Sequence, residues 1–309
     1  MQYSSAAVLI GLLSGLLWGL NSACISWAGD QIALVGAAAF LPLVLAALND
    51  SAAAVTLLIA GGLKGQFSAS WKFFFSKGGV RILLAALLGG PFGQTMYFCG
   101  IWFAGSATAL LFTALYPIFG CLFAKLFLKQ HLTLRMWTGV AFAVFGGMLT
   151  AGSFSFDAEG TVLFGILCSL CAALAWGGEI VLAVSGMAYI PPDAAVRLRE
   201  VISGSVLLLI VALFPPAHDA AVLVISASSS WGAIGGAGIL GGISYLFWYM
   251  ANRALGCAKG TVLNSTYVVW GVLLAASLGL DSLTFEMIVG AVAVLIGVFL
   301  VNEPLHSSD

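Results

Sequence analysis

The chain has 309 residues, of which 61% are hydrophobic and only 7% are charged, with a net charge of −1 and a mean hydropathy of +1.11. A water-soluble domain normally carries about a quarter charged residues. The composition therefore excludes a soluble globule and indicates an integral membrane protein. It also excludes a basic stripe that could bind nucleic acid.

Ten apolar stretches of about 20 residues predict ten membrane-spanning helices, because a helix of that length crosses the hydrocarbon core of a bilayer. Pro42 and the pair Asn49-Asp50 interrupt the second stretch, so its helix could begin earlier than the hydropathy indicates. The predicted spans are residues 5–28, 43–62, 79–101, 104–127, 131–152, 161–187, 194–214, 232–253, 258–279 and 284–302.

The basic residues predict the orientation, since Lys and Arg near helix ends stay on the cytoplasmic side. If the N-terminus is cytoplasmic, all eleven Lys and Arg residues fall on that side and the outer connections carry none. We therefore expect an all-α integral membrane protein with both termini inside (N-in, C-in). Arg199 and Glu200 open the seventh span, and we expect them to pair with each other or to extend to the cytoplasmic surface.

Motifs of the first half of the chain recur in the second half. Trp18-Gly19-Leu20-Asn21 in the first span corresponds to Trp176-Gly177-Gly178-Glu179 in the sixth, and Tyr116 in the fourth corresponds to Tyr267 in the ninth. A pattern of five helices that occurs twice predicts two units, residues 1–152 and 161–302. Because five is odd, the second unit is inverted in the membrane. Inverted repeats are typical of transporters, with the substrate site near the midplane where the units meet.

Glu179 lies in the middle of an apolar stretch, with no basic residue nearby in the sequence. A carboxylate at the bilayer centre costs a few kcal/mol and is seldom kept without a use. Trp176 and Glu179 are spaced i, i+3 and share a helix face. A π-face beside an uncompensated charge suits an organic cation, with cation–π attraction of about 2 kcal/mol or more when desolvated. The alternative is a protonated or arginine-paired glutamate that only fixes helix packing.

More aromatic residues, including Trp248, lie on helices that the repeat brings to the same interface, where they could form a cage for a quaternary ammonium. Any single one of them is more often a packing or lipid-facing residue. The candidate substrate-binding residues are Trp18, Asn21, Tyr97, Trp176, Glu179, Tyr245, Tyr249, Asn264, Tyr267 and Trp270.

Asp50, beside Asn49, is a second acidic residue close to a span. It is a candidate for a proton relay or a cation path, and a position at the membrane interface explains it equally well. Glu179 and Asp50 are therefore the two candidates for ion coupling.

Motifs for catalysis and cofactors are missing from the sequence. The three histidines, His131, His218 and His306, fall in predicted loops, and there is no P-loop, G-x-S-x-G or H-E-x-x-H motif. We expect neither an enzyme nor a metal or cofactor site.

Gly11, Gly15 and Gly19 form consecutive G-x-x-x-G steps, which let helices approach closely. We expect them to pack within one monomer. Rocking of the two halves and a dimer face stay open as further roles.

Leu110–Lys129 (LLFTALYPIFGCLFAKLFLK) resembles the repeat unit of the drug/metabolite transporter superfamily, of the EamA type. Four stretches resemble, more closely, the LicB-type bacterial choline transporters of that superfamily. These stretches are Gly11–Trp18 (GLLSGLLW), Gly165–Glu179 (GILCSLCAALAWGGE), Ile243–Lys259 (ISYLFWYMANRALGCAK) and Thr261–Trp270 (TVLNSTYVVW).

The resemblance implies a ten-helix, inverted-repeat carrier in the bacterial cytoplasmic (inner) membrane. It implies that the carrier takes choline or a related quaternary ammonium through a central cavity lined by aromatic residues. We expect this cation to be imported by alternating access. Trp18, Trp176, Glu179, Tyr245 and Trp270 fall on positions that match the family's pattern. The alternative is an exporter of amino acids or other small metabolites, as in other branches of the superfamily. Proton coupling and the oligomeric state stay open.

Overall fold

The computed structural model describes residues 5–36, 40–65, 72–104, 109, 112–150, 160–277 and 284–302, and within these ranges the chain is helical with no β-strand. The predicted division between the two units, at residues 152–161, falls largely outside the described residues. The helices of the first half are α1 (Ser5–Ala33), α2 (Leu41–Leu63), α4 (Lys77–Leu87), η1 (Leu88–Gln94), α5 (Thr95–Ala104), α7 (Tyr116–Phe127) and α8 (Leu134–Thr150).

The second half is also helical where the structure describes it. Its main helices are α9 (Gly160–Gly186), α10 (Pro192–Leu213), α11 (His218–Ser226), α12 (Trp231–Leu255), α13 (Cys257–Asn264), α14 (Tyr267–Ser277) and α15 (Phe285–Asn302). Two short 3₁₀ turns, η2 (Pro215–Ala217) and η3 (Ser228–Ser230), flank α11. Helices α10 and α11 meet at a bend of 100°.

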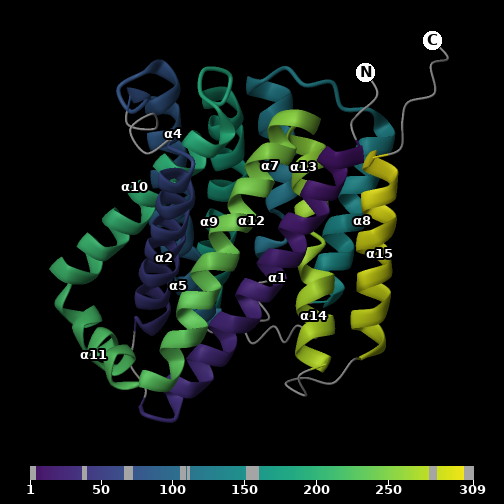
Figure 1. The fold of residues 1–309 in the computed structure, drawn as a ribbon. Helices are drawn as coiled ribbons and strands as arrows, with labels where there is room; N and C mark the ends of the chain where they lie inside the picture. Colours follow the sequence, from purple (N-terminus) through teal and green to yellow (C-terminus); the bar gives the residue numbers. More distant parts are fainter. Residues whose placement is uncertain are drawn as a thin grey trace.

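The helices lie side by side, as expected for a multi-pass membrane protein (Figure 1). Five described helices are long and apolar enough to cross a membrane, or six if the bent pair α10–α11 forms one span. Helices α7, α8 and α15 are apolar but shorter. A described helix occurs in each predicted segment, and the count of ten spans stays a prediction.

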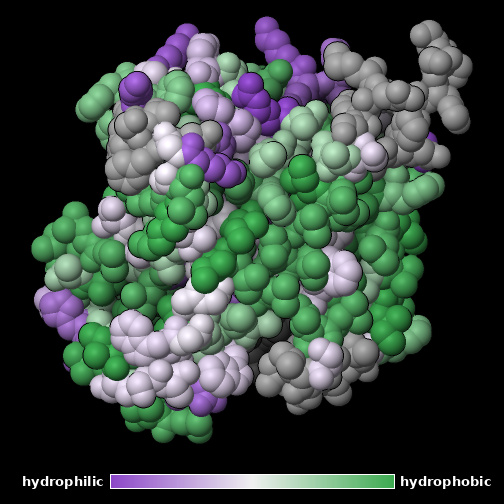
Figure 2. Space-filling view, viewed as in Figure 1, coloured by the Kyte–Doolittle hydropathy of each residue, from purple (hydrophilic) through white to green (hydrophobic). Residues whose placement is uncertain are grey.

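The surface separates into an apolar middle and polar ends. Apolar side chains cover the middle of the visible face, and hydrophilic side chains gather mainly at one end (Figure 2). The first residues of α1 and the last residues of α15 lie at this same end (Figure 1). Lys64 after α2, Lys77 at the start of α4 and Arg253 in the last turn of α12 also belong to this end, which we call the basic end.

Two predicted spans are interrupted at equivalent positions. The predicted span 258–279 is not one helix, because a turn at Ser265–Thr266 separates α13 from α14. In the first half, a turn at Ala114–Leu115 precedes α7. The sequence repeat pairs Tyr116 with Tyr267, and each of these tyrosines is the first residue of the helix after its turn.

The G-x-x-x-G stripe of α1 packs against the broken span α13–α14. A Cβ on Gly11 would lie 2.7 Å from Leu263 Cδ1, and a Cβ on Gly19 would lie 2.9 Å from Trp270 Cβ. A Cβ on Gly15 would collide with Thr266. Small residues therefore bring α1 onto the break within one monomer, as the sequence predicts.

Candidate functional site

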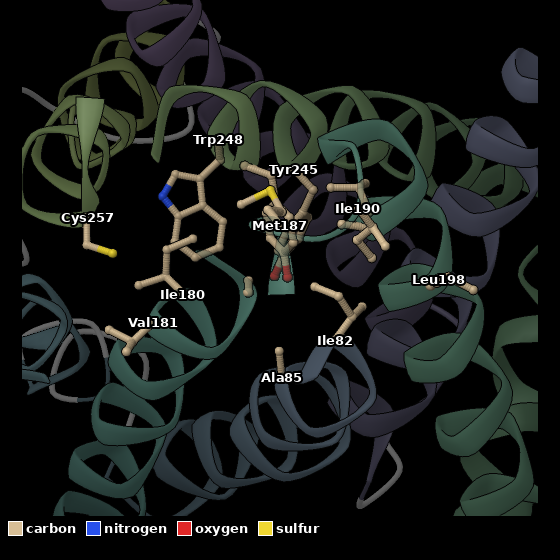
Figure 3. Close-up of a cluster of buried hydrophobic side chains, with 14 of the residues drawn as sticks. Ile82, Ala85, Ile180, Val181, Met187, Ile190, Leu198, Tyr245, Trp248 and Cys257 are labelled. Atoms are coloured by element: carbon tan, nitrogen blue, oxygen red, sulfur yellow. The ribbon is translucent and has the colours of Figure 1, made fainter. Parts of the chain in front are cut away.

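A hollow with about 450 Å³ of empty space, which includes space open to the surroundings, lies between α1, α7, α9, α12, α13 and α14. Figure 3 shows Trp248 projecting from α12 toward Ile180 of α9. We call this space the central cavity. Its lining residues are Trp18, Tyr116, Trp176, Glu179, Ser244, Tyr245, Trp248, Asn264 and Tyr267.

Aromatic rings form much of the wall, and neighbouring rings pack edge to face. The rings of Trp18 and Tyr245 meet edge to face at 5.3 Å between centroids, and those of Tyr245 and Trp248 do so at 5.7 Å. Trp176 Nε1 donates a 3.0 Å hydrogen bond to the Gly89 carbonyl, which fixes the plane of its indole. Because the rings are held in place, their faces are preorganised for a ligand.

Polar groups on another side of the cavity are largely satisfied by one another. The Tyr116 hydroxyl lies 3.1 Å from Asn264 Oδ1, and Asn264 Nδ2 donates to Ser14 Oγ at 3.1 Å. Ser244 Oγ donates to the Ser14 carbonyl at 2.8 Å. These bonds tie α1 to α12 and to α13, and α13 to α7.

Glu179 lies on the cavity wall, but its charge is not uncompensated, contrary to the sequence prediction. Its Oε1 accepts hydrogen bonds from Arg199 Nε at 2.9 Å and from the Tyr249 hydroxyl at 3.1 Å. Its Oε2 has no hydrogen-bond partner among the described residues. The glutamate is therefore paired with arginine, as the alternative predicts, and Glu179 also lines the cavity.

Arg199 is fully buried, so the prediction that it could extend to the cytoplasmic surface is wrong. Its Nη1 lies 3.1 Å from Asp50 Oδ2 and 3.0 Å from Glu200 Oε1. Its Nη2 donates to the Tyr245 hydroxyl at 2.9 Å, and its guanidinium carbon lies 4.1 Å from the centre of the Tyr245 ring. The hydropathy pattern missed this role, because a charge near a predicted helix end looks the same whether it reaches water or an internal partner.

The charge cluster, defined as Arg199, Asp50, Glu179 and Glu200, contains three carboxylates and one guanidinium. All four side chains are fully buried, and they come from α2, α9 and α10. With every group ionised, two negative charges are uncompensated. A buried surplus of this kind attracts cations or protons strongly, because the surroundings screen it poorly.

Asp50 lies in the middle of α2 and is fully buried, which favours an internal position over the interfacial alternative. In addition to Arg199, its Oδ2 accepts a 2.6 Å hydrogen bond from Ser203. Asn49 Nδ2 donates to Asp50 Oδ1 at 3.3 Å, and Asn21 Nδ2 donates to Asn49 Oδ1 at 2.7 Å. A polar chain therefore connects α1 with the charge cluster.

The π-helix η1 brings backbone against this cluster. Pro91 lies inside η1 and cannot donate a helical hydrogen bond, which accounts for the irregular turn. A Cβ on Gly89 would collide with the carboxylate of Glu179, and a Cβ on Gly90 would collide with Ser203. Such π-turns occur frequently at functional sites.

Six of the ten candidate substrate-binding residues line the cavity: Trp18, Trp176, Glu179, Tyr245, Asn264 and Tyr267. The other four are set back from it. Tyr97 packs on Trp176 at 5.4 Å, and Tyr249 lies behind Glu179. Asn21 is bonded to Asn49 and to the Ala237 carbonyl, and Trp270 packs beside Gly19.

Three lining residues, Tyr116, Ser244 and Trp248, are absent from the candidate set. The internal repeat could have identified Tyr116, since it corresponds to the candidate Tyr267. Trp248 is one turn from Tyr245 and shares its helix face. Ser244 carries no distinguishing sequence signal.

Metal-ligating residues do not cluster in the described part of the chain: no group of three or more His, Cys, Asp or Glu side chains there could hold an ion.

Comparison with known proteins identifies a transporter family. The model of a family described as the EamA-like transporter family matches residues 5–152 and 163–303. Protein LicB of Haemophilus influenzae is 29% identical over 189 residues, which make up 61% of this chain and 63% of that protein. The alignment thus spans less than two thirds of that relative's length.

Two further similarities cover more of the chain. An uncharacterized transporter, YyaM of Bacillus subtilis, is 24% identical over 255 residues, which make up 80% of this chain and 79% of that protein. A solved structure described as "Crystal structure of protein" has a TM-score of 0.76 at 21% identity and covers 96% of this chain and 98% of its own. That structural similarity supports the fold alone.

Proposed function

Since the chain belongs to the EamA-like transporter family, within the drug/metabolite transporter superfamily, we propose that it transports choline or a related quaternary ammonium by alternating access. We further propose that it imports this cation across the bacterial cytoplasmic membrane. The central cavity carries the proposal, because Glu179 lines it together with Trp18, Trp176 and Tyr245.

The aromatic wall suits a methylated ammonium head group. A quaternary ammonium has no N–H to donate, so it gains from ring faces and from negative charge that it need not contact directly. Fixed indole planes, such as that of Trp176 on the Gly89 carbonyl, offer such faces without further ordering.

The attraction for a cation arises from the whole charge cluster. Arg199 neutralises only part of the charge of Glu179, Asp50 and Glu200. An organic cation next to Glu179 would offset some of the remaining surplus. The three carboxylates are also the groups on which a coupled proton would reside.

The membrane potential supports inward movement. One positive charge gains about 2.3 kcal/mol per 100 mV on moving to a negative interior. A cation carrier therefore accumulates its substrate without an obligatory second ion, and coupling to protons would add to this driving force.

Export of amino acids is the alternative, and the cavity supports it less well. A zwitterion needs a partner for its carboxylate, and none of the described residues that line the central cavity is basic. Arg199 lies behind Glu179 and Tyr245 and is already bonded to three carboxylates.

Uptake of labelled choline into proteoliposomes, with voltage and pH imposed separately, tests the proposal. We expect uptake driven by an inside-negative potential, strongly reduced in Glu179→Gln and unchanged in Glu286→Gln, which removes an exposed charge at the start of α15. Normal transport by both Glu179→Gln and Trp176→Ala would show that the site is assigned wrongly. A thermal-shift comparison of choline, betaine and amino acids separates the two substrate classes.

A further inference from the structure

A second hollow lies on another face of α9, between α4 and α7, and has about 950 Å³ of empty space. We call it the lateral groove. Its walls are mostly apolar, with Phe123, Phe127 and Leu128 on one side and Val181 and Leu182 on the other. Phe127 is 72% exposed, so the groove opens to the surroundings of the protein.

One basic side chain lines the lateral groove, and a second lies beside it over the same ring. Arg81 lines it and donates a 2.8 Å hydrogen bond from Nη1 to the Ser185 carbonyl. Arg81 and Lys77 both lie over the ring of Tyr189, at 5.1 Å and 5.6 Å from its centre. Neither forms an ion pair with a carboxylate in the described part of the chain, so two positive charges converge there without a counter-charge.

We propose that the lateral groove binds an anionic phospholipid. Its phosphate would contact Lys77 and Arg81, and an acyl chain would lie against Phe123 and Phe127. The pattern of a basic pocket between helices, above an apolar groove, is the one that recognises acidic headgroups. It lies at the basic end, where a negatively charged membrane surface attracts Lys and Arg.

The lateral groove and the central cavity share helix α9. Gly178, Val181 and Leu182 of α9 face the groove, whereas Trp176 and Glu179 of the same helix face the cavity. A bound lipid would therefore pack against the helix that carries Trp176 and Glu179 of the proposed substrate site. Binding itself is independent of the substrate, so it can be tested without any transport.

Retention of lipid by the purified full-length protein tests the proposal. The protein would be equilibrated in detergent with equal amounts of phosphatidylglycerol and phosphatidylcholine, and the bound lipids counted by native mass spectrometry. The variants are Lys77→Gln, Arg81→Gln and the double variant. Lys64→Gln is the matched control, because it removes an exposed charge at the basic end outside the groove.

We expect the wild type and Lys64→Gln to retain phosphatidylglycerol in preference, with about fivefold weaker retention for each groove charge removed. Lys77 is exposed, so Lys77→Gln keeps the test decisive even if Arg81→Gln disturbs folding. Equal retention of both lipids by the wild type, or an equal loss in Lys64→Gln and Lys77→Gln, would overturn the proposal. Retention of a second protein copy in place of lipid would also overturn it.

Discussion

Arg199 Nε lies 2.9 Å from Glu179 Oε1, and both side chains are fully buried. The carboxylate of this cavity-lining residue therefore has a buried cationic partner, and Arg199 is not among the residues that line the cavity. Glu179 is positioned by this contact and by Tyr249, which leaves its second oxygen unpaired among the described residues. The pair orients the carboxylate, and the two other carboxylates of the cluster keep the region negative.

Replacement of Arg199 by Met should strongly destabilise the protein. Three buried carboxylates would lose their only cation in the cluster, and breaking a buried ion pair typically costs about 3–5 kcal/mol. Arg253→Met is the control, because Arg253 is exposed and its one polar contact with the described residues is a 3.4 Å hydrogen bond to the Ile190 carbonyl. The melting temperature in detergent measures the effect, and equal melting of the two variants would contradict it.

Glu200→Gln should be far better tolerated than Arg199→Met. It removes one surplus negative charge, and Glu200 Oε2 has no partner among the described residues. We expect a change in unfolding free energy within about 1 kcal/mol. Because Glu200 does not line the cavity, choline binding should weaken less than in Glu179→Gln. Titration calorimetry checks the ranking, and the reverse order would place the substrate nearer to Glu200.

Trp176 should contribute its ring face more than its hydrogen bond. Trp176→Ala removes a cation–π partner and should weaken choline binding about 30-fold, from a contribution of about 2 kcal/mol. Trp176→Phe keeps a ring but loses the bond to the Gly89 carbonyl, so it should bind with intermediate affinity. If Phe and Ala weaken binding equally, the indole acts only through that bond.

Gly89→Ala should abolish transport, because the added Cβ would collide with the carboxylate of Glu179. Gly62→Ala is the matched control, since a Cβ there has open space around it and alanine favours the helix by about 1 kcal/mol. Uptake by the two variants, normalised to folded protein, provides the measurement. Normal uptake by Gly89→Ala would mean that η1 does not hold Glu179 in the working site.

The sequence could predict the features that depend on one helix at a time. Hydropathy identified an all-helical membrane protein, and the i, i+3 spacing placed Trp176 and Glu179 on one face, where both line the cavity. The repeat motifs indicated the transporter family, which the match over residues 5–152 and 163–303 confirms.

Only the tertiary structure could decide which groups meet between helices. Asp50, Glu179 and Arg199 lie far apart in the chain and join because α2, α9 and α10 pack with particular rotations and depths. Hydropathy assigns a cost to each charge separately, whereas the real cost depends on the partners that packing supplies. For this reason, the sequence identified Glu179 as a negative charge facing a cavity but could not predict the guanidinium behind it.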